Sequence, residues 1–211
     1  EHRSADFAAI DPERAIAVLP TAAHEQHGPH LPVSVDADIN AGLLRAAVDL
    51  APDDLDFRIL PLQAVGKSNE HVRHPGTLTI PYALGAELWI EIGLSVARAG
   101  VRKLVIVNSH GGNVDVIGIV ARELRLRAEM LVAKASWPSF GAPEGLLSER
   151  ERAFGIHGGD YETSLMLHFR PELVDMGAAR DFASSGEALD AAHLRTTGPI
   201  SYGWIAEDVN P

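Results

Sequence analysis

Short apolar runs alternate along this chain with segments in which apolar residues recur every three or four positions. The runs are typical of buried strands and lie at residues 15–19, 57–60, 104–107 and 130–133. The helical spacing lies at residues 37–50, 81–99, 114–126 and 160–169, and Asp36 or Asp38 is placed to cap the first of these helices. Strands that alternate with helices are typical of a parallel sheet covered by helices. The pattern predicts one α/β domain over residues 1–211.

The segment after the first predicted strand is rich in groups that bind metal ions. It carries Glu25, His27, His30 and Asp36, and its glycine and prolines bend the chain so that these groups can converge. Imidazole and carboxylate donors suit zinc, manganese or iron. For any one histidine taken alone, the alternative to a metal ligand is a solvated loop residue. The cluster favours a metal site at the carboxyl edge of the sheet, where α/β proteins bind ligands.

Two further polar motifs should reach the same edge. His110 lies in the segment 108–113, after the third predicted strand; a solvated glycine-rich turn is one alternative there. A phosphate cradle is another, although the segment lacks the P-loop lysine and the dinucleotide spacing. In the last motif His157 precedes two glycines, and Asp160 and Glu162 open a helix, where carboxylates also stabilise the helix dipole.

Together these groups suffice for a pair of divalent cations that share a bridging carboxylate. Such a pair lowers the pKa of a bound water, so that hydroxide forms near neutral pH, and it polarises a carbonyl oxygen. Hydrolysis of an amide is the expected reaction. His157, if it is not itself a ligand, is placed to donate a proton to the departing nitrogen.

Composition narrows the function further. The formal net charge of -11 argues against a nucleic-acid surface, and the absence of cysteine leaves histidine and carboxylates as the metal ligands. No apolar stretch reaches the roughly 18 residues of a membrane-spanning helix, and the first residues lack the apolar core of a signal peptide. We therefore expect a cytoplasmic enzyme that binds neither membrane nor nucleic acid.

The motifs together resemble the creatininase family, the creatinine amidohydrolases and their relatives. The resemblance rests on residues 25–32 with Asp36, then 68–77, 108–113, 157–159 and 162–164. It implies a three-layer α/β/α fold around a mainly parallel sheet and assembly as a homohexamer. Family members generally run several dozen residues beyond the equivalent of Pro211, so we expect a C-terminal part of the family domain to be missing.

The resemblance also implies roles for the residues of the motifs. Glu25 and His110 would bind one metal, His27 the other, and Asp36 would bridge them, with His157 as the catalytic histidine. In the creatinine enzymes a glutamate two positions after the equivalent of His110 completes the second metal, and here that position is Gly112. We expect Asp160 to take over this ligand role, with Glu162 as the competing candidate and as a second catalytic residue.

The resemblance leaves the substrate open. Ser68, Glu70 and His71 are loop residues that could reach it or stay solvated, and Trp137 could wall the pocket or lie half-buried in the core. Because of Gly112, creatinine is not the expected substrate. The sequence predicts a metal-dependent amidohydrolase, zinc first and manganese or iron next, that hydrolyses a C–N bond of a small cyclic or linear amide with metal-bound hydroxide. A formamide deformylase or short-peptide hydrolase is the alternative, and a non-catalytic metal- or ligand-binding protein is the alternative from another class.

Overall fold

A parallel sheet of four strands forms the centre of the molecule. The computed structural model describes residues 3–191 and 193–209. The strands are β1 (Ala15–Thr21), β2 (Asp56–Ile59), β3 (Lys103–Asn108) and β4 (Leu131–Ser136), in the spatial order β2-β1-β3-β4. Every pairing is parallel. The predicted α/β fold with a parallel sheet is confirmed, and each strand lies where the apolar runs predict it.

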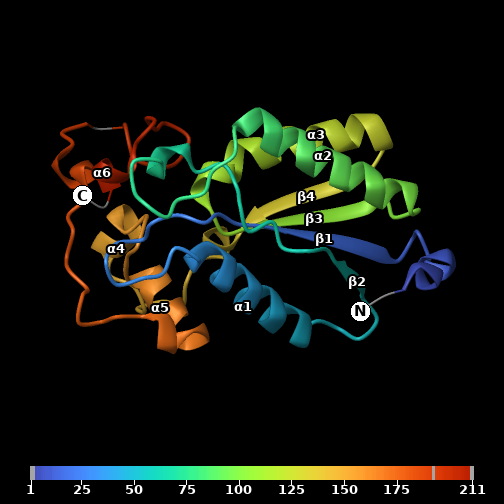
Figure 1. Ribbon diagram of the computed structural model, residues 1–211, viewed down its shortest axis with the longest axis horizontal. Helices are drawn as coiled ribbons and strands as arrows, with labels where there is room; N and C mark the ends of the chain where they lie inside the picture. Colours follow the sequence, from blue (N-terminus) through green and yellow to red (C-terminus); the bar gives the residue numbers. More distant parts are fainter. Residues whose placement is uncertain (1–2, 192, 210–211) are drawn as a thin grey trace.

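Helices cover both faces of the sheet. α2 (Tyr82–Arg98) and α3 (Val114–Ala128) pack against each other on one face, while α1 (Val35–Asp49) and α5 (Asp160–Phe169) lie together on the other (Figure 1). Two short helices that the sequence pattern did not reveal, α4 (Glu149–Phe154) and α6 (Ala206–Val209), lie near the strands' carboxyl ends. The arrangement is the three-layer α/β/α fold that the resemblance implies.

The main core lies between the sheet and the helices α2 and α3. Leu19, Leu104 and Ile106 face Trp89, Ile117 and Leu124 in a cluster of buried side chains. Each large apolar side chain that is fully buried contributes about 1.5–3 kcal/mol to the hydrophobic stabilisation. This packing holds the sheet rigid, so the loops at its edge start from fixed positions.

A smaller apolar cluster joins α1 to α5 on the other face. Val35, Ile39 and Met166 are buried there. A Cβ built on Gly42 would lie 2.6 Å from ring atoms of Phe169, so the absence of a side chain at position 42 lets the two helices approach closely. This contact places the beginning of α5, with its carboxylates, beside the beginning of α1.

The strands end at one level, which sets the position of the functional loops. Thr21 of β1 pairs in register with Asn108 of β3, and Asn108 with Ser136 of β4. The Thr21 hydroxyl donates to Asn108 Oδ1 over 3.1 Å, and Asn108 Nδ2 donates to Ser136 Oγ over 3.1 Å. The loops that follow therefore start side by side at the carboxyl edge, toward which the orange and red C-terminal segments gather in Figure 1.

The predicted cap of α1 is wrong. Ser34 holds the N-cap position, and Asp36 is the second residue of the helix. The Asp36 side chain is 2% exposed and points into a cluster of ionisable groups, whereas Asp38 pairs with Arg170 at 2.7 Å. Asp36 is therefore available for another role than capping.

No helix among residues 3–191 and 193–209 has both the length and the apolar character needed to cross a bilayer.

Candidate metal centre and active site

Glu25 lies at the centre of a buried cluster formed by the loops that follow β1 and β3. Its Oε1 is 3.2 Å from Nδ1 of His110, 3.5 Å from Nε2 of His71 and 3.7 Å from Nδ1 of His157. Its other oxygen accepts a hydrogen bond from the Ser68 hydroxyl. One carboxylate thus brings together three segments that are distant in the sequence.

Asp36 lies between two histidines of this cluster. Its Oδ2 is 3.3 Å from Nδ1 of His110, and its Oδ1 is 3.8 Å from Nε2 of His27. A carboxylate that faces one imidazole with each oxygen has the arrangement of a bridging ligand. The bridging role that the resemblance implies for Asp36 stays a prediction.

Glu162 approaches the cluster from the first turn of α5. Its Oε1 lies 3.8 Å from Nε2 of His27, and its Oε2 accepts a hydrogen bond of 2.5 Å from the amide of Gly158. Three triads of potential ligand atoms, each within 4.8 Å of one another, occur in the described part of the chain. They are Glu25 with His71 and His157, Glu25 with His27 and Asp36, and His27 with His157 and Glu162.

Several buried atoms of the cluster lack a hydrogen-bond partner. Within the described residues, these include His27 Nε2, His71 Nε2 and Asp36 Oδ2. Leaving a buried polar group unsatisfied costs about 1–3 kcal/mol. All three residues belong to the triads of potential ligand atoms. A divalent cation that accepts nitrogen and oxygen donors would supply the missing partners, so such cations fit the site.

Backbone carbonyls fix the orientation of two histidines. His110 Nε2 lies 2.8 Å from the carbonyl oxygen of Lys67, and His27 Nδ1 lies 3.0 Å from that of Glu25. Because a carbonyl only accepts, each of these nitrogens carries a proton, and His110 Nδ1 and His27 Nε2 are the ring nitrogens that face the carboxylates and could bind a cation. Metal-binding histidines in proteins are held in the same way.

His157 is oriented by the loop after β1. Its Nε2 donates to the carbonyl oxygen of Gln26 over 2.6 Å, and its ring centroid lies 4.2 Å from those of both His27 and His71. Burial, and then the charges of these two histidines, hold the pKa of His157 well below its usual range. The imidazole is therefore neutral, with the lone pair of Nδ1 directed toward Glu25.

The pKa values of two buried carboxylates are shifted in opposite directions. For Glu162, burial raises the pKa to about 7 because it outweighs the attraction of His27. For Glu70, the hydrogen bond and charge of His110 together with a hydrogen bond from Lys67 outweigh burial and lower the pKa to about 2. Groups whose pKa values are driven apart are typical of functional sites.

The loop residues predicted to reach substrate or stay solvated are buried. Ser68 and His71 are 0% exposed and Glu70 is 9% exposed, so the solvated alternative is wrong for all of them. Ser68 and His71 contact Glu25, and Glu70 Oε1 lies 3.4 Å from His110 Nε2. Ser68 and Glu70 thus contact members of the cluster, while His71 belongs to one of its triads of potential ligand atoms.

Two predicted residues are not brought into the cluster. Asp160 is exposed at the first position of α5 and lines a neighbouring cavity, while Glu162 one half-turn further on points inward. Trp137 donates its indole N–H to Asn40 Oδ1 over 3.2 Å, and the residues that follow it line the pocket in its place. The helix periodicity, which separates positions 160 and 162 by about 200°, explains why only one of the two acids can face the histidines.

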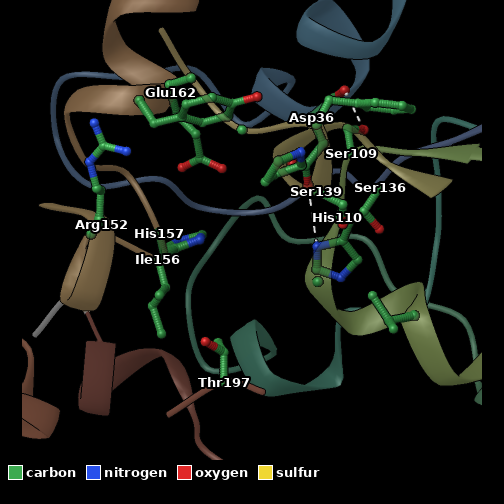
Figure 2. A pocket seen from close by; sticks show the side chains of 18 of the residues that line it. Asp36, Ser109, His110, Ser136, Ser139, Arg152, Ile156, His157, Glu162 and Thr197 are labelled. Carbon is green, nitrogen blue, oxygen red and sulfur yellow. Dashed lines mark hydrogen bonds and ion pairs between the residues drawn. The ribbon is translucent and has the colours of Figure 1, made fainter. Parts of the chain in front are cut away.

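A cavity of about 750 Å³ opens onto the cluster. Figure 2 shows Asp36 and His110 on one side of it and His157 and Glu162 on the other, with Thr197 and Arg152 toward its rim. The cavity admits a small molecule to all of these side chains at once.

The sequence analysis missed the aromatic wall of this cavity. Trp204 lines it and contacts His71 edge to face, with ring centroids 5.9 Å apart. Glu207 holds this segment in place, because its Oε1 lies 3.7 Å from Arg73 and 3.9 Å from His74. No periodic pattern marks the segment; a tryptophan in a short, glycine-containing stretch is the signal that the sequence offers.

Comparison with known proteins finds relatives of this chain. The mycofactocin precursor peptide peptidase of Mycolicibacterium smegmatis is 34% identical over 157 residues, 74% of this chain and 58% of that protein. The creatinine amidohydrolase of Pseudomonas putida is 30% identical over 181 residues, 79% of this chain and 68% of that protein. The chain therefore spans little more than half the length of the first of these relatives.

Solved structures agree with the sequence comparison. A creatininase structure with Mn has a TM-score of 0.69 at 26% identity and covers 98% of this chain and 80% of its own. A mutant creatininase of the Zn-Zn type has a TM-score of 0.68 at 27% identity, with 98% and 81% covered. The family described as creatininase, creatinine amidohydrolase, matches residues 1–211. By this match over its whole length, by its fold and by its relatives, the chain belongs to the creatininase family.

Proposed function

We propose that this chain is the core of a metal-dependent amidohydrolase that hydrolyses a C–N bond of a small amide. The observation that carries the proposal is the buried cluster of carboxylates and histidines, in which His27 Nε2, His71 Nε2 and Asp36 Oδ2 lack hydrogen-bond partners. Such a cluster is unfavourable without cations and favourable with them. Zinc is the first candidate, and manganese or iron the next.

The distances support an assignment of ligand roles. Glu25 and His110 would hold one cation, His27 and Glu162 the other, and Asp36 would face both. When bound, a cation pair supplies an activated water and polarises a carbonyl oxygen. Glu162 replaces Asp160 in this proposal because only Glu162 points toward His27.

His157 would move the proton. Its Nδ1 has a free lone pair that faces the cluster, and its low pKa keeps that lone pair available at neutral pH. It can take a proton from the attacking water and give it to the departing nitrogen, so that one amide and one water become a carboxylic acid and an amine. The hydrogen bond to the Gln26 carbonyl holds the ring in the orientation that this transfer needs.

A linear amide, such as a short peptide or a formamide, is the substrate class that we favour over a compact cyclic amide. Two observations support this choice: the cavity of about 750 Å³ is larger than a small ring needs, and the relative with 34% identity is named as a peptide peptidase. Trp204 at the cavity wall offers an apolar surface for such a chain. Cyclic amides remain the second candidate because of the creatinine amidohydrolase relative.

The experiment is a substrate panel. Protein loaded with zinc, manganese or iron is incubated with cyclic amides, formamides and dipeptides, with and without a chelator, and released amine or formate is measured. We expect release that the chelator abolishes and that returns when metal is restored. If no compound of the panel is hydrolysed while metal binds, the alternative of a non-catalytic metal-binding protein is correct.

Assembly as a homohexamer and a cytoplasmic location stay predictions of the resemblance and the composition. Size-exclusion chromatography with multi-angle light scattering of the purified chain at micromolar concentration tests the first. A species of one chain mass, 22.6 kDa, would contradict it.

A further inference from the structure

The turn that contains Glu70 occupies the space in which a side chain at position 112 would lie. A Cβ built on Gly112 would lie under 3.0 Å from Glu70 Oε1, from His110 Nε2 and from the carbonyl oxygen of Lys67. Real Cβ atoms essentially never make such contacts. The neighbouring Gly111 is different, because a Cβ there would have nothing within 4 Å. Only the second glycine of the motif is therefore required for this close approach.

Two acceptors from the same turn face the Nε2 of His110. The Lys67 carbonyl oxygen lies 2.8 Å from this nitrogen and Glu70 Oε1 lies 3.4 Å from it. The other oxygen of Glu70 pairs with the ammonium group of Lys67 at 2.6 Å. Lys67 thus contributes its carbonyl to the histidine directly and holds the Glu70 carboxylate beside it.

Both oxygens of Glu70 are engaged inside the protein. The side chain is 9% exposed, and among the described residues that line the large cavity Glu70 does not occur. A direct contact with substrate, which the sequence predicts for this residue, is not what its position favours. Its carboxylate acts on the face of His110 that points away from Glu25 and Asp36.

We propose that Glu70 is a positioning residue that, with the Lys67 carbonyl, clamps the Nε2–H of His110, and that Gly112 is the position that allows this clamp to close. The inference rests on the proposed function, because it explains how one ligand of the cation site is oriented. A carboxylate behind a metal-binding histidine fixes the ring and increases the basicity of the nitrogen that faces the metal. In this proposal, the glycine that stands at position 112 in place of the family's glutamate leaves room for the acid at position 70.

The test combines single variants with a double-mutant cycle. Zinc affinity is measured by competition with a chromophoric chelator for Glu70→Ala, Gly112→Ala and the double variant. Each single variant should bind zinc about 10–100-fold more weakly, as is usual when a partner behind a metal ligand is lost. The double variant should be no weaker than the worse single variant, since both changes break the same clamp. Losses that simply multiply would overturn the proposal.

Controls separate the clamp from general damage. Gly111→Ala, at the adjacent open position, should leave zinc affinity unchanged, as should Glu13→Gln, an exposed acid at the opposite edge of the sheet. Glu70→Gln keeps an oxygen acceptor and the shape of the side chain, and should lose less affinity than Glu70→Ala. If Glu70→Ala does not fold, an unchanged affinity of Glu70→Gln and of Gly112→Ala would still refute the clamp.

A measurement without metal distinguishes this inference from the proposed function. Nitrogen-15 spectra of the metal-free protein report whether His110 carries its proton on Nε2 and how fast that proton exchanges with water. We expect slow exchange in the wild type and faster exchange in Glu70→Ala. Failure of the wild type to bind zinc would refute the proposed function while leaving this test intact; equal exchange rates in the two proteins would refute the clamp alone.

Discussion

Nδ1 of His110 lies 3.2 Å from Oε1 of Glu25, although one residue follows β3 and the other follows β1. The contact exists because the two strands are neighbours that end at the same level. Burial by itself lowers the pKa of His110, but the charge of Glu25 together with hydrogen bonds to Asp36, Glu25 and Glu70 outweighs burial and raises the pKa well above its usual value. Without a cation, a proton on the histidine balances the buried carboxylate, so a bound cation must displace protons.

Glu162→Gln should lower the metal content of the purified protein, and Asp160→Asn should not. Both residues lie in the first turn of α5, but only Glu162 approaches His27, at 3.8 Å, while Asp160 is exposed. Each change removes one negative charge from the same helix N-terminus, so each variant controls for the helix-dipole effect of the other. Elemental analysis of both proteins gives the answer. Equal loss in the two variants would mean that helix stability is responsible rather than ligation.

Zinc binding should release protons, and the apparent affinity should rise as the pH increases through about 7. The reason is that the metal-free Glu162 carboxyl, whose pKa burial raises to about 7, is largely protonated below this pH and must lose its proton to become a ligand. Titration calorimetry in two buffers of different ionisation enthalpy measures the number of protons released. An identical heat in both buffers at pH 6.5 would contradict the prediction.

His157→Gln should abolish most turnover on the best substrate of the panel while the metal content stays near that of the wild type. Loss of a group that transfers protons typically costs about 10²–10⁴-fold in rate. The glutamine keeps a polar group near the Gln26 carbonyl, which limits any change in the loop. Turnover and elemental analysis on one preparation separate the two roles. If metal is lost in parallel with turnover, His157 is a ligand instead.

Trp204→Ala should raise KM for elongated amides more than for compact ones, with a smaller change in kcat. The indole lines the cavity and lies edge to face against His71, so its removal widens the space away from the reacting atoms. Trp137→Phe is the matched control, because Trp137 bonds to Asn40 and lies outside the lining. Steady-state kinetics on substrates of two lengths measures the changes in KM and kcat. A uniform fall in kcat for all lengths would show that Trp204 acts on the catalytic groups.

Gly42→Ala should destabilise the fold by about 1–3 kcal/mol, because a methyl group would lie 2.6 Å from the Phe169 ring and force α1 and α5 apart. Urea unfolding followed by circular dichroism measures the change. Gly118→Ala on α3 is the control: its nearest neighbour would be a Lys134 side-chain carbon at 3.7 Å, and alanine favours a helix. A Gly42→Ala protein as stable as the wild type would show that the interhelical contact adjusts freely.

The strands and the long helices could be read from the sequence because apolar periodicity is a local property. That the polar residues following β1 and β3 lie close together was also predictable, since parallel strands place such residues at one edge. The choice between Asp160 and Glu162 was not, because it depends on how α5 rotates against α1, and that rotation is set by Met166 and Phe169 rather than by the polar motif. Trp204 and the burial of Glu70 depend on long-range packing of irregular segments, which leaves no repeating signal.

That β1 and β3 end at the same level has a consequence for how the substrate preference of such a protein can change in evolution. The groups that would bind the ions follow the strands of the rigid sheet. Trp204 at the cavity wall belongs instead to a C-terminal stretch that is held by surface ion pairs. Substitutions in that stretch can alter which molecules are admitted without disturbing the reactive centre. New substrate preferences can therefore arise while the cluster around Glu25 stays unchanged.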